Sequence, residues 1–587
     1  MNTSNISVIY DKSNKYANQI VDNIYQHFCY DISDIMAVNL GYEIHLYNVF
    51  INKREIESIN KNNCCLCVII ITDSFFHDAS ATQNMVDKLK DKHINTLLIS
   101  LSNNKNLFID LNLLMVDVNN LEKNLSRIMC VLAQKLCNRK VTIFLSYFRA
   151  EGDKYCKEFK NRTLNLPGFA EFLDIKDIEI GSNIQQEIES CIKDNMMLCI
   201  YTPKYSERFW GMVELLIAKK NNVPIVIADC LDGVEKRRNP NSGNVPVIRF
   251  NYPINDEIVS DTVLLLMKEY LRKCIFHQES NQQKSVLYLW KSPELSDLAK
   301  AKKANLSSVV YPAPPICRCE VEYYNELFDI DFILDNNISQ NNSKITKKIV
   351  LSYAEGNARE HTHPHFLKSI TAEILRYLIY GNYTISYGGD WRKNGFTQQI
   401  INFIDIYRSR HQGNTAFLNN YFVNLCGDDI SHIEQEIFSY GKIILIPYED
   451  NACKALTNMR LQLISDSDAV IVLGGHLTSN NGITSGIAEE VALAIINNKP
   501  LYLIGASGGA TKTIVDIMNG MSYEFTSRYF DTDCQEQLHI INNTISNITI
   551  EDISKNNGLS LNENLVLFNS QNINLLLSTL FRGIERI

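Results

Sequence analysis

An internal repeat constrains the fold more than any other feature of this sequence. The segment EIESINKNNCCLC, which begins at Glu55, returns as EIESCIKDNMMLC at Glu187, 132 positions later. Each copy is a polar, helix-like stretch followed by a continuous apolar run, which is typical of a helix leading into a buried strand of a parallel sheet. At this offset the identical positions, numbered in the first copy, are Glu55, Ile56, Glu57, Ser58, Lys61, Asn63, Leu66 and Cys67.

The repeat predicts the division of the chain into domains. Each copy opens with a strand-like run, ISVIY near Ile6 and VTIFLSY at Val141, and then alternates helix and strand patterns. This alternation indicates an α/β fold with a parallel sheet. We expect two copies of one domain at residues 1–130 and 139–277, a connector rich in proline and asparagine at 278–344, and a further α/β region at 345–587.

Composition excludes several classes of function. The net charge of −9 disfavours sequence-independent binding of nucleic acid, which relies on neutralising phosphates. No apolar run reaches the roughly 18–20 residues that span a bilayer, and the first residues do not resemble a signal peptide, so we expect a cytoplasmic protein without membrane contact.

The cysteines and histidines are not spaced as metal ligands. Many cysteines lie in strand-like runs, which favours buried free thiols over disulfides. The CxC of Cys317 and Cys319 lacks a second pair, and His361, His363 and His365 surround a proline at no known ligand spacing. We therefore expect no metal and no resident cofactor.

The second copy resembles the TIR domain family over about 135 residues. The sequence motifs that carry the resemblance are the strand end Ser146-Tyr147, Asp153, the loop Asp174–Gly181, and the run from Tyr205-Ser206 through Trp210 to Glu214. Family members usually have Trp-Cys where this chain has Trp210-Gly211. The resemblance implies a flavodoxin-like domain in each copy, the first of them degenerate.

Many TIR domains cleave the nicotinamide–ribose bond of NAD⁺, and the resemblance implies that Glu214 is the catalytic carboxylate. A carboxylate stabilises or attacks the positive charge that builds on the ribose carbon, and nicotinamide needs no general acid because it leaves from a cationic state. NAD⁺ would be the substrate, with Tyr147 or Phe148 stacking on nicotinamide, Asp174 and Gly181 in a lid, and Ser206 and Trp210 beside the site. The first copy has Asn84 or Met85 where the second has Glu214, so we expect it to be inactive.

The carboxy-terminal region resembles the SLOG superfamily of Rossmann-like nucleotide-binding domains. Glycine pairs follow successive strand-like runs, and glycines let backbone N–H groups approach a phosphate. Members of this superfamily sense nucleotide-derived signals in bacterial antiviral defence, and others are phosphoribohydrolases with a Gly-Thr pair that is missing here. The ligand-binding candidates are Gly388, Gly389, Arg392, Arg460, Gly474, Gly475, Gly482, Gly486 and Glu489.

Together the two resemblances imply an NAD⁺ glycohydrolase controlled by a nucleotide signal and assembled as a homo-oligomer or filament. The alternatives are a non-enzymatic TIR scaffold, an ADP-ribosyl transferase or cyclase, and a phosphoribohydrolase that uses Glu489 or Glu490.

Overall fold

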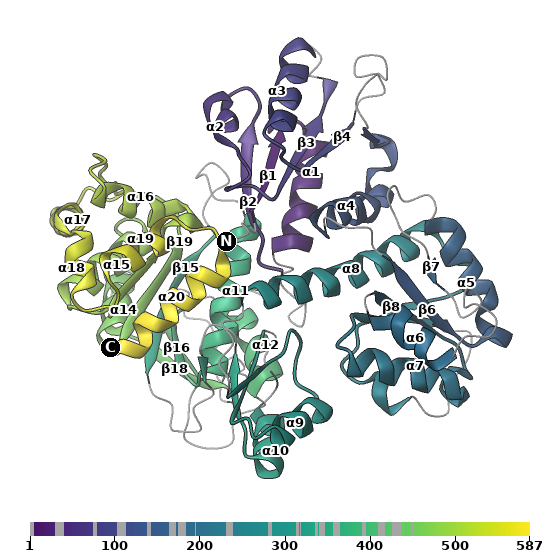
Figure 1. Cartoon of the computed structure of the whole chain (residues 1–587). Helices are drawn as coiled ribbons and strands as arrows, with labels where there is room; N and C mark the ends of the chain where they lie inside the picture. Colours follow the sequence, from purple (N-terminus) through teal and green to yellow (C-terminus); the bar gives the residue numbers. More distant parts are fainter. Residues whose placement is uncertain are drawn as a thin grey trace. The chain divides into compact units, whose positions relative to one another are not determined.

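The computed structural model is an α/β protein whose described residues form four sheets, three of them wholly parallel (Figure 1). None of the helices that the structure describes combines the length and apolar character that crossing a membrane requires. The structure describes residues 5–29, 40–73, 79–101, 113–137, 142–163, 172–173, 184–193, 195–230, 239–279, 285–312, 316, 318–334, 338–339, 347–355, 364–389, 395–408, 417–424, 437, 439–448, 451–479 and 481–587.

The first copy of the repeat forms sheet A, with strand order β2-β1-β3-β4-β5. This is the flavodoxin-like order, in which β2 lies on one side of β1 and the later strands lie on the other. The strands are β1 (Asn5–Tyr10), β2 (Glu43–Asn48), β3 (Leu66–Ile71), β4 (Thr96–Ser100) and β5 (Leu114–Met115). The helices are α1 (Lys15–Ile24), a π-helix (Tyr25–Cys29), α2 (Lys53–Ser58), α3 (Ala79–Asp91) and α4 (Leu121–Cys137), with a 3₁₀ turn at Val118–Asn120.

The second copy forms sheet B with the matching order β10-β9-β8-β6-β7. Its strands are β6 (Ile143–Tyr147), β7 (Phe172–Leu173), β8 (Met196–Tyr201), β9 (Ile225–Cys230) and β10 (Val247–Phe250). Its helices are α5 (Arg149–Thr163), α6 (Ile184–Lys193), α7 (Phe209–Lys220) and α8 (Asp256–Glu279), with 3₁₀ turns at Tyr205–Glu207 and Pro240–Ser242.

The repeated apolar runs are the central strands of these two sheets. Strands β3 and β8 are buried at every position, because helices cover both faces of a parallel sheet. Helices α4 and α8 pack against each other, and Cys130 donates its thiol hydrogen to the carbonyl of Ser260 at 3.0 Å. Among the described cysteines of the repeated apolar runs, Cys64, Cys67 and Cys199 are buried free thiols, as the sequence predicts.

The segment that we expected to be a connector contains sheet C, with order β11-β12-β13-β14. The strands β11 (Val286–Tyr288), β12 (Ser308–Tyr311) and β13 (Asp331–Leu334) are parallel, and β14 (Ile338–Ser339) is antiparallel to β13. Helices α9 (Leu295–Lys303) and α10 (Arg318–Phe328) join them. Very short strands between polar and proline-rich stretches give little periodic signal, so the sequence pattern missed this sheet.

Sheet D occupies the carboxy-terminal region, with order β18-β17-β16-β15-β19-β20. The chain builds outward from β15 to β18 and then returns to place β19 on the other side of β15. Its strands are β15 (Lys348–Ala354), β16 (Thr384–Gly388), β17 (Leu418–Val423), β18 (Gly441–Ile446), β19 (Ala469–Gly474) and β20 (Leu501–Ile504). In an open α/β sheet a ligand usually binds outside the carboxyl ends of the strands at such a reversal.

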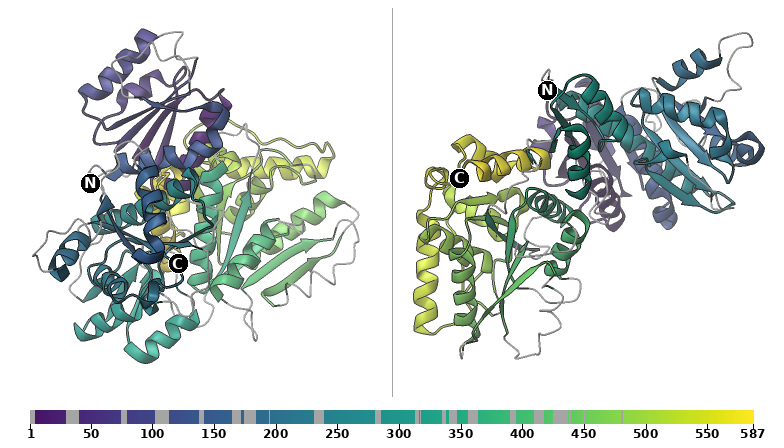
Figure 2. Two further views of the ribbon diagram at one scale, coloured as in Figure 1. Left: turned by 90° about the vertical axis from the view of Figure 1, so that its right-hand side faces the viewer. Right: turned by 90° about the horizontal axis from the view of Figure 1, so that it is seen from below.

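The helices of this region follow the strands. The helix Leu561–Asn569 packs against β20, and the last helix of the chain, drawn in yellow in Figure 2, packs on it. A 3₁₀ turn at Gly505–Ser507 follows β20. The helices are α11 (Pro364–Tyr380), α12 (Phe396–Arg408), α14 (Ala452–Ser465), α15 (Gly486–Ile496), α16 (Gly509–Met518), α17 (Thr532–Asn547), α18 (Ile550–Ser554), α19 (Leu561–Asn569) and α20 (Ile573–Arg586).

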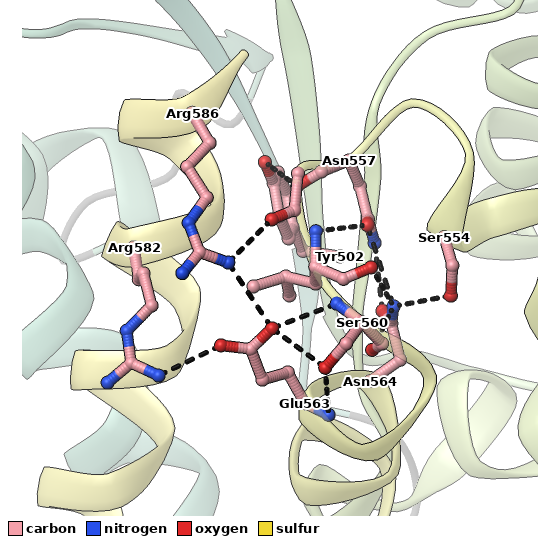
Figure 3. Close-up of polar contacts among 10 residues, drawn as sticks. Tyr502, Ser554, Asn557, Ser560, Glu563, Asn564, Arg582 and Arg586 are labelled. Atoms are coloured by element: carbon pink, nitrogen blue, oxygen red, sulfur yellow. Dashed lines mark hydrogen bonds and ion pairs between the residues drawn. The ribbon is translucent and has the colours of Figure 1, made fainter.

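A carboxylate network joins α19 to α20 (Figure 3). Glu563 accepts hydrogen bonds from the backbone N–H and the hydroxyl of Ser560, at 2.8 and 2.9 Å, which completes the capping box of α19. Its carboxylate also lies 2.9 Å from Arg582 and 3.3 Å from Arg586 of α20. The Ser560 N–H and the Arg582 guanidinium hold the pKa of Glu563 at about 2.

We expect Glu563→Gln to loosen α19 and α20 at neutral pH. Because the folded-state pKa is lowered, the charge stabilises the fold above the unfolded pKa and stops doing so as the pH falls toward 2. Substitution should cost about 1 kcal/mol at pH 7. Amide hydrogen exchange of α19 and α20 should therefore be faster in the variant at pH 7, and the difference should vanish near pH 2. A difference that persists unchanged at pH 2 would contradict this account.

Candidate functional site

Glu214 of α7 is fully buried at the carboxyl end of β6. One carboxylate oxygen accepts from Arg208 Nη2 at 3.2 Å, and the other accepts a hydrogen bond from the hydroxyl of Ser146. The Ser146 hydroxyl also lies 2.7 Å from the hydroxyl of Tyr205. The carboxylate is therefore held in place by a guanidinium and a hydroxyl.

The chain path before α7 places these groups. Tyr205 begins a single 3₁₀ turn, and Arg208 then takes an extended conformation as the residue before the helix. The Tyr205 ring is buried and stacks on Tyr201 with ring centroids 4.2 Å apart. A Cβ atom on Gly211 would lie 3.3 Å from that ring, so glycine at this position lets α7 lie close to Tyr205.

Burial sets the protonation of the groups around Glu214. It raises the pKa of Tyr205 well above its usual value and the pKa of Cys199 to about 12. Both side chains therefore stay neutral at physiological pH. Glu214 and Arg208 form the ion pair of this site.

The other residues predicted for this site differ in burial and in their contacts. Tyr147 is 2% exposed with its ring beside Gly152, so it does not offer a stacking surface, whereas Phe148 is half-buried. The Ser206 hydroxyl accepts from the Asn239 N–H at 2.9 Å. Trp210 is partly buried against the core of this domain. Asp174 and Gly181 lie outside the described residues.

The first copy has Met85 where the second has Glu214. Helices α3 and α7 end in the same way, since Ile94 N–H bonds to the Leu89 carbonyl and Val223 N–H bonds to the Ala218 carbonyl. Met85 lies four residues before Leu89, as Glu214 lies four before Ala218. Its side chain packs on the apolar core of that domain. At this position, the first copy carries no carboxylate.

A second candidate site is a cavity of about 430 Å³ at the carboxyl ends of β15 and β16 and after β19. It lies at the point where the strand order of sheet D reverses, where ligands bind in open α/β sheets. Its lining is polar and includes three groups able to carry positive charge. The lining residues are Leu351, Ser352, Tyr353, Ala354, Tyr387, Gly388, Arg460, His476, Thr478, Ser479, Gly486, Ile487, Glu490 and Arg528.

Arg460 was expected to pair with a phosphate, but it pairs with two carboxylates. Its Nη1 donates to Glu489, and its Nε lies 3.7 Å from Oε1 of Glu490. Glu489 also accepts from the Thr457 hydroxyl at 2.5 Å. Arg460 does line the cavity, but these ion pairs offset much of its charge.

Most of the predicted glycines serve packing. A Cβ on Gly482 or Gly486 would lie 2.9 Å from the Arg460 guanidinium, which passes beneath this loop. Gly474 has φ +61 and Gly475 has φ +100, and their added Cβ atoms would lie 2.5 Å from the Ala354 carbonyl oxygen and 2.3 Å from Ile487. Both are buried and neither lines the cavity.

Gly388 and Gly389, the first predicted glycine pair, have different surroundings. Gly388 lines the cavity, whereas a Cβ on Gly389 would lie 2.9 Å from Phe422. Arg392 lies outside the described residues, as do Cys317, His361 and His363.

Several residues that line the cavity were not among the predicted site residues, although they share a short sequence pattern. Ser-Tyr pairs end two strands of sheet D, at Ser352-Tyr353 and near Tyr387, as Ser146-Tyr147 ends β6. His476 and Arg528 had no comparable signal, because each enters the cavity from an irregular loop.

Sheet D is the parallel sheet of a Rossmann-like domain, with a polar cavity at its strand ends. The sequence profile of the family described as SLOG cluster2 matches residues 343–431 and 426–567. The carboxy-terminal half of the chain therefore contains a SLOG cluster2 domain, which suggests nucleotide sensing.

Comparisons with whole proteins add little. A search of curated proteins found no match. Among solved structures, the C-terminal domain of glucosamine-fructose-6-phosphate aminotransferase from Francisella tularensis is 11% identical, with 47% of this chain and 85% of that chain covered and a TM-score of 0.15. The catalytic subunit of cobaltochelatase from Mycobacterium tuberculosis is 10% identical, with 99% and 63% covered and a TM-score of 0.17. TM-scores this low define no common fold.

We expect Gly474→Ala to destabilise sheet D, because the added methyl group meets a backbone carbonyl at a positive φ. The free energy of opening of the β19 amides, measured by hydrogen exchange, should fall by more than about 2 kcal/mol. Gly520→Ala is the matched control, since Gly520 has φ +95 but nothing within 4 Å of the added Cβ. The control should cost about 1 kcal/mol at its own site and leave β19 unchanged. Equal, small effects of both substitutions on β19 would show that the Gly474 contact is easily relieved.

Proposed function

We propose that this chain is an NAD⁺-cleaving enzyme whose activity is controlled by a nucleotide-derived ligand bound in the cavity of the SLOG domain. The observation that carries the enzymatic part is Glu214, a carboxylate enclosed at the carboxyl end of a parallel strand and paired with Arg208 and Ser146. The strand order of sheet B and the resemblance of residues 139–277 to TIR domains support the same assignment.

Cleavage of the nicotinamide–ribose bond requires little of the protein beyond a correctly positioned carboxylate. As the nicotinamide–ribose bond breaks, nicotinamide leaves with the bonding electron pair and becomes neutral, and positive charge develops on the ribose carbon. Glu214 stabilises that charge or bonds to the carbon, and water or another acceptor then takes the ADP-ribose. Transfer or cyclisation differs from hydrolysis only in the acceptor.

In this mechanism, the contacts of Glu214 in the structure correspond to the inactive, resting state. With Arg208 and Ser146 on its two oxygens, the carboxylate is neither accessible to substrate nor free of a countercharge. Activation therefore requires Arg208 to move away. A nucleotide achieves this only by binding the active state more tightly than the resting one.

Self-association is the proposed link between ligand binding by the SLOG domain and NAD⁺ cleavage. Ligand binding to the SLOG domain favours an oligomer or filament, in which the NAD⁺ site opens. A cell that depletes its NAD⁺ on receiving such a signal would halt viral replication, which fits a role in antiviral defence. The proposed partners are thus NAD⁺, a nucleotide and further copies of this chain.

A purely structural role for Glu214 is the second candidate, and its complete burial favours it. In that case sheet B would be an interaction module and the Arg208–Glu214 pair would serve its stability. Removing one partner of a buried ion pair typically costs about 3–5 kcal/mol. The two candidates are separated by measuring both nicotinamide release and folding in the same variants.

We expect Glu214→Gln to lower nicotinamide release from NAD⁺ by about 100- to 1000-fold, because the neutral amide cannot stabilise the cationic carbon. Glutamine keeps the shape of the side chain and leaves no cavity, whereas alanine would empty a buried site. No residual activity is expected from the first copy, where Met85 stands at this position. Glu207→Gln, at an exposed glutamate just before α7, is the control and should behave as wild type. Nicotinamide release within threefold of wild type in a folded Glu214→Gln variant would remove Glu214 from the mechanism.

We expect Arg208→Ala to raise the NAD⁺ cleavage that is measured without any nucleotide. The substitution removes the countercharge and the group that covers Glu214, so the rate should rise several-fold. Combining it with Glu214→Gln should abolish the gain, and Lys220→Ala, at an exposed cation of the same helix, should leave the rate unchanged. A lower rate in a folded Arg208→Ala protein would mean that Arg208 positions Glu214 for catalysis and does not restrain it.

A further inference from the structure

Two buried cysteines of the SLOG domain meet between helices α14 and α17. Cys453 lies in the first turn of α14 and Cys534 lies in the first turn of α17, 81 positions later, and their sulfurs are 3.6 Å apart. Both side chains are buried, and both are free thiols in the structure. Their separation in the sequence gives no sign of the pair, because the two residues come together only through the fold.

Each cysteine is held in place by the cap of its own helix. The side chain of Asn451 caps α14 and accepts from the Cys453 N–H at 2.8 Å, and the side chain of Asp531 caps α17 and accepts from the Cys534 N–H at 3.0 Å. Because the sulfurs of a disulfide are about 2.05 Å apart, those of Cys453 and Cys534 need to approach by only about 1.5 Å. The pair is therefore positioned for a disulfide.

The segment before α17 connects this cysteine pair to the cavity. Arg528 lines the cavity and lies in the loop that leads into α17. This loop is tied to α17, because the backbone of Phe525 donates to and accepts from the Asn542 side chain, both at 2.9 Å. Arg460, which also lines the cavity, lies on α14 seven residues after Cys453. A bond between the two sulfurs thus joins the segments that supply these two arginines to the cavity.

We propose that Cys453 and Cys534 are a site of reversible oxidation, at which hydrogen peroxide forms a disulfide that fixes α17 and the loop bearing Arg528 against α14. The sulfur of one thiolate attacks a peroxide oxygen, the O–O bond breaks, and a sulfenic acid and water form. The other sulfur then attacks the oxidised sulfur, so that the S–S bond forms and the S–O bond breaks with release of a second water. Two thiols lose two electrons and two hydrogens, and one peroxide becomes two waters.

Burial keeps the pair reduced until an oxidant acts on it. It raises the pKa of Cys453 and raises the pKa of Cys534 to about 12, so both thiols are protonated at neutral pH and the reactive thiolate is scarce. The first oxidation is therefore the slow step. Closure of the disulfide is fast by comparison, because the second sulfur is already in contact with the first.

The test is treatment of the full chain with hydrogen peroxide, followed by proteolysis and mass spectrometry without reductant. We expect a pair of peptides joined through Cys453 and Cys534, lighter by two hydrogen atoms than the reduced peptides together. Amide hydrogen exchange in the loop bearing Arg528 and in the first turn of α17 should slow by about tenfold or more, since a cross-link restricts local opening. Dithiothreitol should reverse both changes.

Matched variants identify the sulfurs that react. Cys453→Ser and Cys534→Ser should each abolish the linked peptides and the slower exchange, whereas Cys274→Ser, at a half-buried cysteine of α8, should leave both as in wild type. Exchange of the β19 amides under reducing conditions should confirm that each variant is folded.

Two results would overturn the proposal. One is the absence of the linked peptides, including the case in which either cysteine is instead oxidised to a sulfinic acid. The other is an equal slowing of exchange in the peroxide-treated serine variants, which would assign the effect to oxidation elsewhere. Neither result bears on nucleotide binding or on NAD⁺ cleavage, so this inference stands or falls separately from the proposed function.

Discussion

Parallel pairing of strands determines where chemistry can occur in this protein. In sheets A, B and D every described strand pair is parallel, so all carboxyl ends lie at one edge of each sheet. Side chains that are far apart in the chain therefore meet there, as do Ser146 and Glu214 across 68 positions and Ser352 and Glu490 across 138. Both candidate sites follow from this one constraint.

The two sites are built to the same plan on different sheets. In each, a serine near the end of the domain's first strand donates to a glutamate on the helix that follows the neighbouring strand. An arginine lies beside each glutamate, Arg208 at 3.2 Å and Arg460 at 3.7 Å. The difference lies in access, because Glu214 is wholly covered whereas Glu490 lines a cavity. One arrangement is a closed site and the other is open to a ligand.

The sequence predicts much of the framework, because burial on both faces of a parallel sheet leaves continuous apolar runs. The buried strands β3, β8 and β19, the repeat and the helix carrying Glu214 all follow from such patterns. Sheet C does not, since its strands of two to four residues gain their stability from neighbours distant in sequence.

The details of the sites could not be predicted, because they depend on side-chain placement. The sequence around Arg208 and Glu214 does not reveal that a 3₁₀ turn places the guanidinium beside the carboxylate. The glycines after β19 suggest a phosphate cradle from sequence alone. The structure assigns Gly482 and Gly486 to the space beside Arg460, and Gly474 and Gly475 to a positive φ with no room for a Cβ. A glycine pattern therefore indicates that other atoms lie close to the backbone, but it does not distinguish a ligand from the rest of the protein.

The energy needed to open the Glu214 site sets the scale of the control in the proposed mechanism. Removing one partner of a buried ion pair such as Arg208–Glu214 costs about 3–5 kcal/mol, which gives the scale for leaving Glu214 without its countercharge. Converting a population from 1:99 to 99:1 requires about 5.5 kcal/mol of differential binding, or roughly a 10⁴-fold preference of the ligand for one state. The two quantities are of the same order, so one well-enclosed nucleotide, or weaker binding combined with contacts between copies, suffices to offset the lost ion pair. In the proposed mechanism, a site that Arg208 and Ser146 hold closed is thus both silent at rest and within reach of a small-molecule signal.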